Sequence, residues 1–109
     1  IQVYACLATG CYRYDEKHHA LNSVSKEDVR PAGTPVYLVL VADEDKPYAG
    51  LDAGMVSQNI SLFCAGTGLA TYPRAQMDTE RLKRALKLNS TQRLMLSHPV
   101  GYAERVTQN

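Results

Sequence analysis

The amino-acid sequence predicts an α+β sandwich, and three observations support that class. Residues 1–24 have the aromatic and β-branched composition of strands separated by short polar turns. Residues 35–42, Pro-Val-Tyr-Leu-Val-Leu-Val-Ala, are an unbroken apolar run of strand length. Residues 52–69 have helical length and almost no charged side chains. Together these segments predict a central, mostly antiparallel sheet packed against a long buried helix.

The first segment predicts a hairpin or meander, because two apolar stretches end at a polar Asp-Glu-Lys-His turn over residues 15–18. A short helix is expected to follow. Ser25 would cap it, Asp28 would reach back as in a capping box, and Pro31 would interrupt it.

The apolar run over residues 35–42 lacks the alternation of a half-exposed strand, so we expect it to be covered on both faces and to lie near the middle of the sheet.

The helix expected over residues 52–69 has apolar side chains around its whole circumference, which predicts burial on most sides. A chain of 109 residues removes only about two thirds of its unfolded surface from water. We therefore expect a second subunit, or a further part of the same protein, to cover this helix. Gly66 and Gly68 lie at the end of the helix rather than before its start, so they predict a C-terminal cap and not a phosphate loop.

The last third of the chain predicts an extended segment over residues 70–76, then a helix from Thr79 to Leu88 capped by Asp78. Met77 and Leu82 have the spacing of a hydrophobic staple. Asn89 would end the helix, and a final strand is expected over residues 93–98, before Pro99. The basic side chains of this helix form a solvated face: Arg81, Lys83, Arg84 and Lys87.

Composition indicates a single domain, residues 1–109, and excludes several classes of partner. Twelve basic and eleven acidic residues without runs argue against nucleic-acid and membrane binding. No apolar run approaches the roughly 20 residues of a membrane span. Three cysteines without CxxC spacing are expected to be reduced. A Cys6–Cys11 disulfide is possible only if their Cα atoms come within about 7 Å, which a straight strand through both would forbid. A soluble, cytoplasmic protein is expected.

Few residues suggest catalysis. His18 and His19 are interpreted as turn or solvated residues and His98 as a buried, hydrogen-bonded core histidine, and no metal site is expected. No G-x-S-x-G nucleophile elbow occurs. The segment over residues 70–76 remains, because a proline beside the short side chain of Ala75 gives the stiff, accessible backbone that a flat cofactor needs.

Read together, residues 52–102 resemble the C-terminal half of the FMN-dependent nitroreductase family, and residues 12–21 resemble its hairpin. The resemblance depends on the order and spacing of several short motifs rather than on any strict one. These motifs are Tyr12-Arg-Tyr-Asp15, His19-Ala-Leu21, Asp52-Ala-Gly54, Gln58-Asn59, Gly66-Thr-Gly-Leu69, the loop 70–76, Leu82-Lys-Arg-Ala-Leu86 and Pro99-Val-Gly-Tyr102.

The resemblance implies an intertwined homodimer that holds FMN at the subunit interface, with the long helix in the dimer core. It implies an oxidoreductase that takes electrons from NADH or NADPH and passes them to nitro, quinone or similar acceptors. It names no catalytic acid or base. The positions that match the family's flavin-binding residues are Tyr72, Pro73, Arg74, Ala75, Gln76 and Arg105.

The family's arginine-rich phosphate-binding segment has no counterpart in residues 1–30, so these 109 residues are expected to be a C-terminal portion of the domain. An alternative stays open, in which the chain is a catalytically inactive, truncated relative. Such a protein would act as a flavin- or small-ligand-binding module, or as a dimerisation module.

Overall fold

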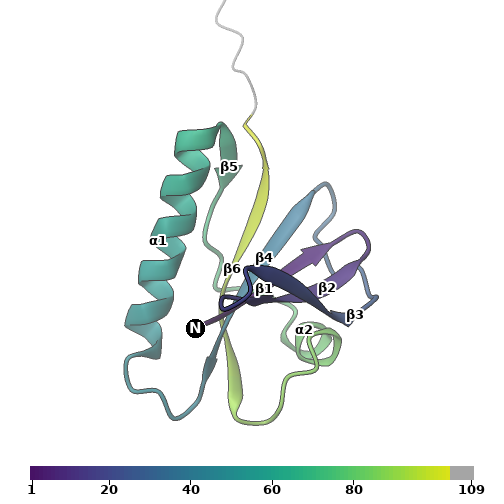
Figure 1. Ribbon diagram of the computed structural model, residues 1–109, viewed down its shortest axis with the longest axis vertical. Helices are drawn as coiled ribbons and strands as arrows, with labels where there is room; N and C mark the ends of the chain where they lie inside the picture. The colour runs from purple at the N-terminus through teal and green to yellow at the C-terminus, as the bar shows by residue number, and fades with distance from the viewer. Residues whose placement is uncertain (104–109) are drawn as a thin grey trace, which may run out of the picture.

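The computed structural model describes residues 1–103, which form one antiparallel six-stranded sheet with a helix on either side of it (Figure 1). The spatial order of the strands is β3-β2-β1-β4-β6-β5. The elements are β1 (Gln2–Leu7), β2 (Gly10–Asp15), β3 (Ala20–Ser25), β4 (Val36–Asp43), α1 (Ala49–Thr67), β5 (Leu69–Thr71), α2 (Thr79–Ala85) and β6 (Gln92–Tyr102). The predicted α+β class is confirmed.

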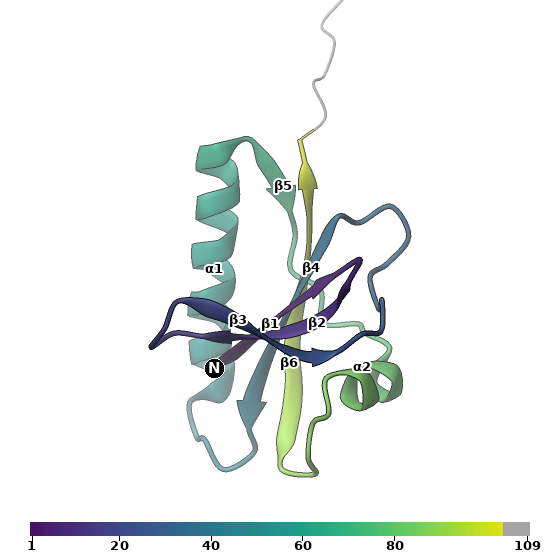
Figure 2. The same ribbon diagram turned by 45° about the vertical axis from the view of Figure 1, so that its right-hand side comes forward.

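The meander predicted at the start of the chain is formed by β1, β2 and β3, which twist away from the remaining strands (Figure 2). The Asp15 carboxylate accepts hydrogen bonds from the backbone N–H groups of Lys17 and His18, and this fixes the turn between β2 and β3. His18 also contacts Asp15 at 2.8 Å, while His19 contacts the Tyr14 hydroxyl at 2.7 Å. Both histidines are exposed turn residues, as predicted.

No helix lies between Ser25 and the start of β4, so the prediction of a short helix there was wrong. Ser25 is instead the last residue of β3. The Asp28 carboxylate accepts hydrogen bonds from the backbone N–H and the guanidinium of Arg30, so it stabilises a local turn rather than a helix N-terminus. The guanidinium also holds the pKa of Asp28 down, to about 2.

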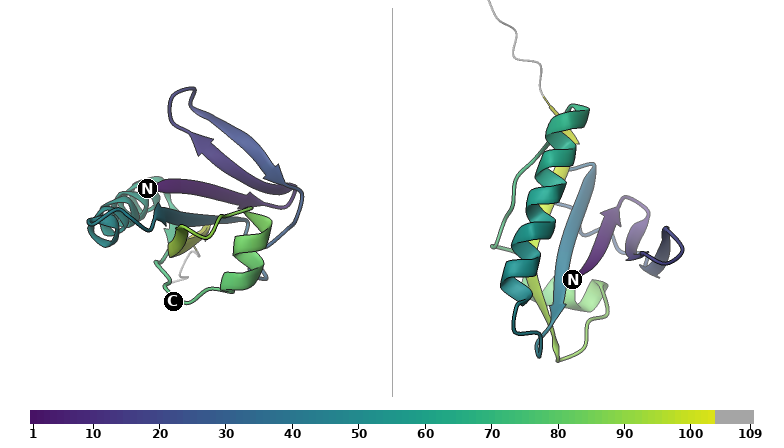
Figure 3. Two further views of the ribbon diagram at one scale, coloured as in Figure 1. Left: turned by 90° about the horizontal axis from the view of Figure 1, so that it is seen from below. Right: turned by 60° about the vertical axis from the view of Figure 1, so that its left-hand side comes forward.

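The apolar run forms β4, which lies between β1 and β6 and is covered on both faces, as predicted. One face packs against α2, where Val39 and Val41 join Leu82 and Leu86 in the main apolar core. The other face lies under α1, which runs along β4 and β6 in Figure 3.

Helix α1 begins at Ala49 and ends at Thr67, slightly before the predicted bounds. Within the single chain it is not enclosed, which corrects the expectation of burial on most sides. Its sheet-facing side buries Ala49, Ala53, Ser57 and Cys64. Its outer side leaves several large apolar residues more than half exposed: Leu51, Met55, Leu62 and Phe63.

Gly68 ends α1 in the left-handed conformation, with φ of 78°, and its N–H bonds to the carbonyl of Cys64. The C-cap interpretation is confirmed. A side chain at a positive φ is strained, and an added Cβ here would contact nothing that compensates. We expect Gly68→Ala to lower the free energy of unfolding by about 1 kcal/mol. Urea denaturation measures this loss, and an equal loss in Gly66→Ala, whose φ is not positive, would contradict it.

The C-terminal elements differ from their predicted lengths. Asp78 caps α2 as predicted, with its carboxylate accepting from the N–H of Arg81, but the helix ends at Ala85, before Leu88. Lys87 ends the turn that follows with φ of 54°. The last strand, β6, continues through Pro99 to Tyr102.

Proline is tolerated inside β6 because of where its nitrogen lies. Ser97, two residues earlier, pairs with Arg74, so the nitrogen of Pro99 faces the same edge of β6. The ladder with β5 only begins at Val100, which pairs with Thr71. The missing N–H therefore falls in a gap between two pairings and costs no ladder hydrogen bond.

Candidate functional site

The candidate site is the loop over residues 72–76, which leads from β5 to α2 along the edge of β6 (Figure 2). Two reciprocal backbone hydrogen bonds attach this loop to β6. The N–H of Arg74 donates to the carbonyl of Ser97 at 2.8 Å, and the N–H of Ser97 donates to the carbonyl of Arg74 at 2.8 Å. Ser97 is completely buried, so the loop is attached to a rigid part of the sheet.

This pairing decides which backbone donors of the loop are available to a ligand. Pro73 has no N–H, and the N–H of Arg74 is already bonded to Ser97. The N–H groups of Tyr72, Ala75 and Gln76 have no backbone partner within residues 1–103. Ala75 is exposed and carries only a methyl group, so a flat ligand can approach its N–H and that of Gln76.

A buried histidine lies directly beside the loop. His98 on β6 is completely buried, and its Nε2 lies 2.7 Å from the hydroxyl of Ser57 on α1. Its Nδ1 lies 3.0 Å from the hydroxyl of Thr71, the last residue of β5. One imidazole ring thus connects the long helix, the sheet and the residue that precedes the loop. The prediction of a hydrogen-bonded core histidine is confirmed.

The hydrogen bonds define the tautomer of His98. Thr71 donates its single hydroxyl proton to the carbonyl of Pro99 at 2.8 Å, so its oxygen can only accept from the ring. Nδ1 therefore carries the proton, and Nε2 accepts from Ser57. Burial lowers the pKa of His98 below 6.5, because the charged imidazolium loses its hydration in the interior. The ring is neutral at pH 7.

A cavity of about 250 Å³ opens on the α2 side of the loop. Its basic residues come from three segments: Arg30 before β4, Arg74 in the loop and Arg81 on α2. Gln76 of the loop and the buried Tyr37 of β4 also line it. Sequence reasoning missed this cavity, since nothing local indicates that three arginines up to 51 positions apart share one wall.

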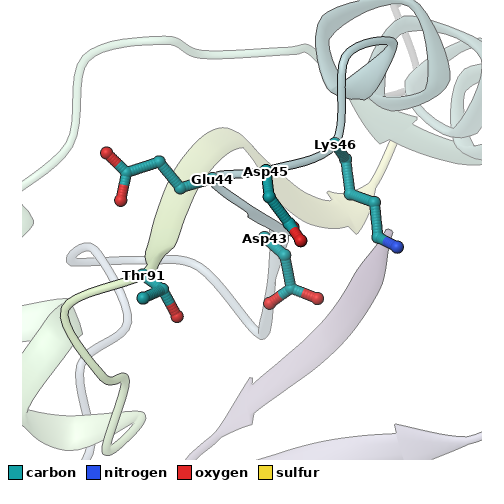
Figure 4. A pocket seen from close by; sticks show the side chains of 5 residues that line it. All are labelled: Asp43, Glu44, Asp45, Lys46 and Thr91. Atoms are coloured by element: carbon teal, nitrogen blue, oxygen red, sulfur yellow. The ribbon is translucent and has the colours of Figure 1, made fainter.

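Two other concave regions have different characters. The first, of about 440 Å³, lies at the loop over residues 43–46, but Glu44 points away from Asp43 and Asp45 in Figure 4, so the carboxylates do not converge. Within residues 1–103, no three His, Cys, Asp or Glu side chains are grouped as a metal site would require. The second, of about 430 Å³, is an apolar groove between α1 and β4 lined by Leu38, Ile60 and Phe63 among others.

All three cysteines are free and buried, so the expectation of reduced cysteines is confirmed. Cys6 and Cys11 are not on one straight strand, because the turn between β1 and β2 folds them opposite each other in the ladder. Burial and the neighbouring Cys11 raise the pKa of the Cys6 thiol, so it stays protonated at neutral pH.

All but one of the predicted cofactor-binding residues lie in the described part of the chain. The loop fixed by the Arg74–Ser97 pairing contains five of them, with Arg74 half-buried and the others exposed: Tyr72, Pro73, Arg74, Ala75 and Gln76. Arg105 lies outside the described residues. Within residues 1–103, no helix has the length and apolar character to span a membrane.

Comparison with known proteins finds a family match and similar structures. The model of the nitroreductase family matches residues 7–102. The fold superposes on a crystal structure from Ralstonia eutropha JMP134, a protein predicted to be a nitroreductase, with a TM-score of 0.86 and 30% identity. That alignment covers 96% of this chain and 59% of the other, so this chain spans about three fifths of the length of that relative.

Two more distant structures share the fold. One is the Escherichia coli microcin synthetase McbBCD complex with truncated pro-MccB17 bound, with a TM-score of 0.80 and 15% identity over 95% of this chain and 52% of that one. The other is a predicted nitroreductase from Anabaena variabilis ATCC 29413, with a TM-score of 0.76 and 19% identity over 91% and 26%. A comparison with curated proteins gives no match.

The sheet, the long flanking helix and the loop fixed by Ser97 define an α+β sandwich. The match over residues 7–102 is specific: this chain belongs to the nitroreductase family.

Proposed function

We propose that the protein is an FMN-dependent oxidoreductase of the nitroreductase type, which transfers electrons from NADH or NADPH to nitro, quinone or similar acceptors. The observation that carries the proposal is the loop over residues 72–76. Family membership supports the class of reaction. The available N–H groups of Ala75 and Gln76 on a fixed backbone support the cofactor.

The residues present fit a flavin ring. When bound, FMN supplies hydride acceptance and electron transfer, which amino-acid side chains do not provide. Within this chain, the N–H of Ala75 or Gln76 would donate to the ring's heteroatoms and stabilise negative charge there. Pro73 and the Arg74–Ser97 pairing hold these donors in place, so little order is lost on binding.

The second part of the proposal is a homodimer formed through the outer side of α1. Leu62 and Phe63 are 60% and 65% exposed, and the apolar groove beside α1 continues this surface. A contiguous apolar patch of this kind marks an interaction surface in a protein of this size. A second copy of the chain is the partner that the family resemblance implies.

The test of the cofactor is direct. Purified protein is mixed with FMN, freed of excess ligand and examined for flavin absorbance at about 450 nm. Ala75→Pro removes the backbone N–H of residue 75 and adds only the small pyrrolidine ring. We expect FMN binding to weaken about 10-fold. Ala75→Ser keeps the N–H and serves as the control, with binding expected to be unchanged.

Circular dichroism verifies that both variants are folded. Equal FMN affinity in the two variants would contradict the role of this N–H. Protein that takes up no FMN at any concentration would refute the cofactor and leave the alternative, a small-ligand-binding or dimerisation module without catalysis.

A further inference from the structure

We propose that the cavity between the loop and α2 binds the carboxylate of a small, partly apolar organic acid. That this cavity holds an electron acceptor rests on the proposed oxidoreductase function, whereas the binding of an organic acid does not. The proposal depends on the charges that line this cavity, on the hydroxyl of Tyr37 and on the cavity's apolar walls.

The charges around the cavity are unequal. Arg30 is neutralised by Asp28, which accepts from its Nε and Nη2 at 2.9 Å. The other carboxylate at the cavity, Asp78, accepts from the backbone of Arg81. The guanidinium of Arg74 forms no ion pair or hydrogen bond within residues 1–103, although the residue is half-buried. A guanidinium with unpaired N–H groups favours an anion that accepts through two oxygens, such as a carboxylate.

A tyrosine hydroxyl indicates the same kind of ligand. Tyr37 is 4% exposed as a residue and lines the cavity, and its hydroxyl makes no hydrogen bond within the described part of the chain. Its oxygen is not among the fully buried atoms without a partner, so it is accessible to a ligand. A carboxylate oxygen between Tyr37 and Arg74 would accept from both side chains.

The remaining walls favour an organic acid over inorganic phosphate. Val29, Met77 and Leu82 give the cavity an apolar side, which a phosphate ion could not use. A volume of about 250 Å³ is below the range of drug-sized pockets, so the ligand is small. An acid with a single ring matches both conditions.

The test uses benzoate as the probe, measured by calorimetric titration of the protein in the absence of flavin. We expect benzoate to bind, benzamide to bind at least 10-fold more weakly, and added salt to weaken benzoate alone. Arg74→Gln should weaken benzoate binding about 10-fold, and Tyr37→Phe should weaken it several-fold. Arg84→Gln, a matched loss of charge on α2 outside the cavity, should leave binding unchanged.

The proposal is overturned if benzamide binds as well as benzoate, or if Arg84→Gln weakens binding as much as Arg74→Gln. Binding of inorganic phosphate without binding of benzoate would also overturn it. Because the titration contains no flavin, it is separable from the proposed function. Benzoate binding without FMN binding would refute the cofactor alone, and FMN binding without benzoate binding would refute the acid site alone.

Discussion

His98→Leu is expected to lower the free energy of unfolding by about 3 kcal/mol. Leucine has a similar volume, so the loss comes mainly from hydrogen bonding rather than from a cavity. The hydroxyl of Ser57, in a residue only 6% exposed, would lose the partner that lies at 2.7 Å. Thr71 would keep its bond to Pro99 but lose the proton donated by the ring. A buried hydroxyl left without a partner costs about 1–3 kcal/mol.

Urea denaturation measures the loss, and a second substitution isolates its cause. Ser57→Ala in the His98→Leu background removes the orphaned hydroxyl, so we expect it to restore about 1 kcal/mol. The same Ser57→Ala change in the wild-type chain should instead be destabilising. If His98→Leu costs less than 1 kcal/mol, the buried hydrogen-bond network does not contribute as described.

The pH dependence of stability gives an independent readout. The folded-state pKa of His98 lies below its unfolded value of 6.5, so the neutral ring favours folding. This contribution is fully present above pH 6.5 and is lost as the pH falls from 6.5 towards the folded pKa. His98→Leu should remove this part of the slope. An identical slope in the wild type and the variant would show that His98 does not titrate between the two states.

His98→Leu should loosen the loop over residues 72–76 more than it loosens α1. Thr71 directly precedes Tyr72, so the loss of its hydrogen bond to the His98 ring loosens one end of the segment whose middle is fixed by the Arg74–Ser97 pairing. Hydrogen exchange of the Arg74 amide, which donates to the carbonyl of Ser97, should therefore accelerate in His98→Leu even where the global stability remains high. Unchanged exchange at this amide would limit His98 to a structural role elsewhere.

The sequence was sufficient to predict those elements whose signals are local. The meander, the buried strand β4, the Asp78 cap and the Gly68 cap each depend on residues within a few positions of one another, and all were confirmed. The short helix after Ser25 failed for an equally local reason. The Asp28 carboxylate has two possible backbone partners, and the guanidinium of Arg30 favours the turn.

The parts of the site that depend on distant residues were not predictable. The Arg74–Ser97 pairing joins positions 23 apart, and the Ser57–His98 hydrogen bond joins positions 41 apart. Neither pairing leaves a period or a motif in the sequence. The loop itself was identified from its proline and alanine, but which of its N–H groups are free depends on the pairing and emerges only from the fold.

The surface of α1 gives the second large effect. If the outer side of this helix forms the proposed dimer, Leu62→Glu places an unpaired carboxylate in an apolar interface, and we expect the dimer dissociation constant to rise at least 100-fold. The isolated chain should be little affected, because Leu62 is 60% exposed. Sedimentation equilibrium measures the change. Leu21→Glu on β3, where the leucine is 48% exposed, is the control and should leave association intact.

Gly54 on the same helix separates association from folding, because the two effects have opposite signs. A Cβ at Gly54 would contact nothing within 4 Å in the single chain, and a side chain there increases helix propensity. Gly54→Leu should therefore raise the stability of the monomer by about 0.5–1 kcal/mol. In a packed interface the added volume costs about 1–3 kcal/mol and weakens the dimer roughly 10- to 100-fold. A variant that is more stable and equally associated would show that this side of α1 contacts no second subunit.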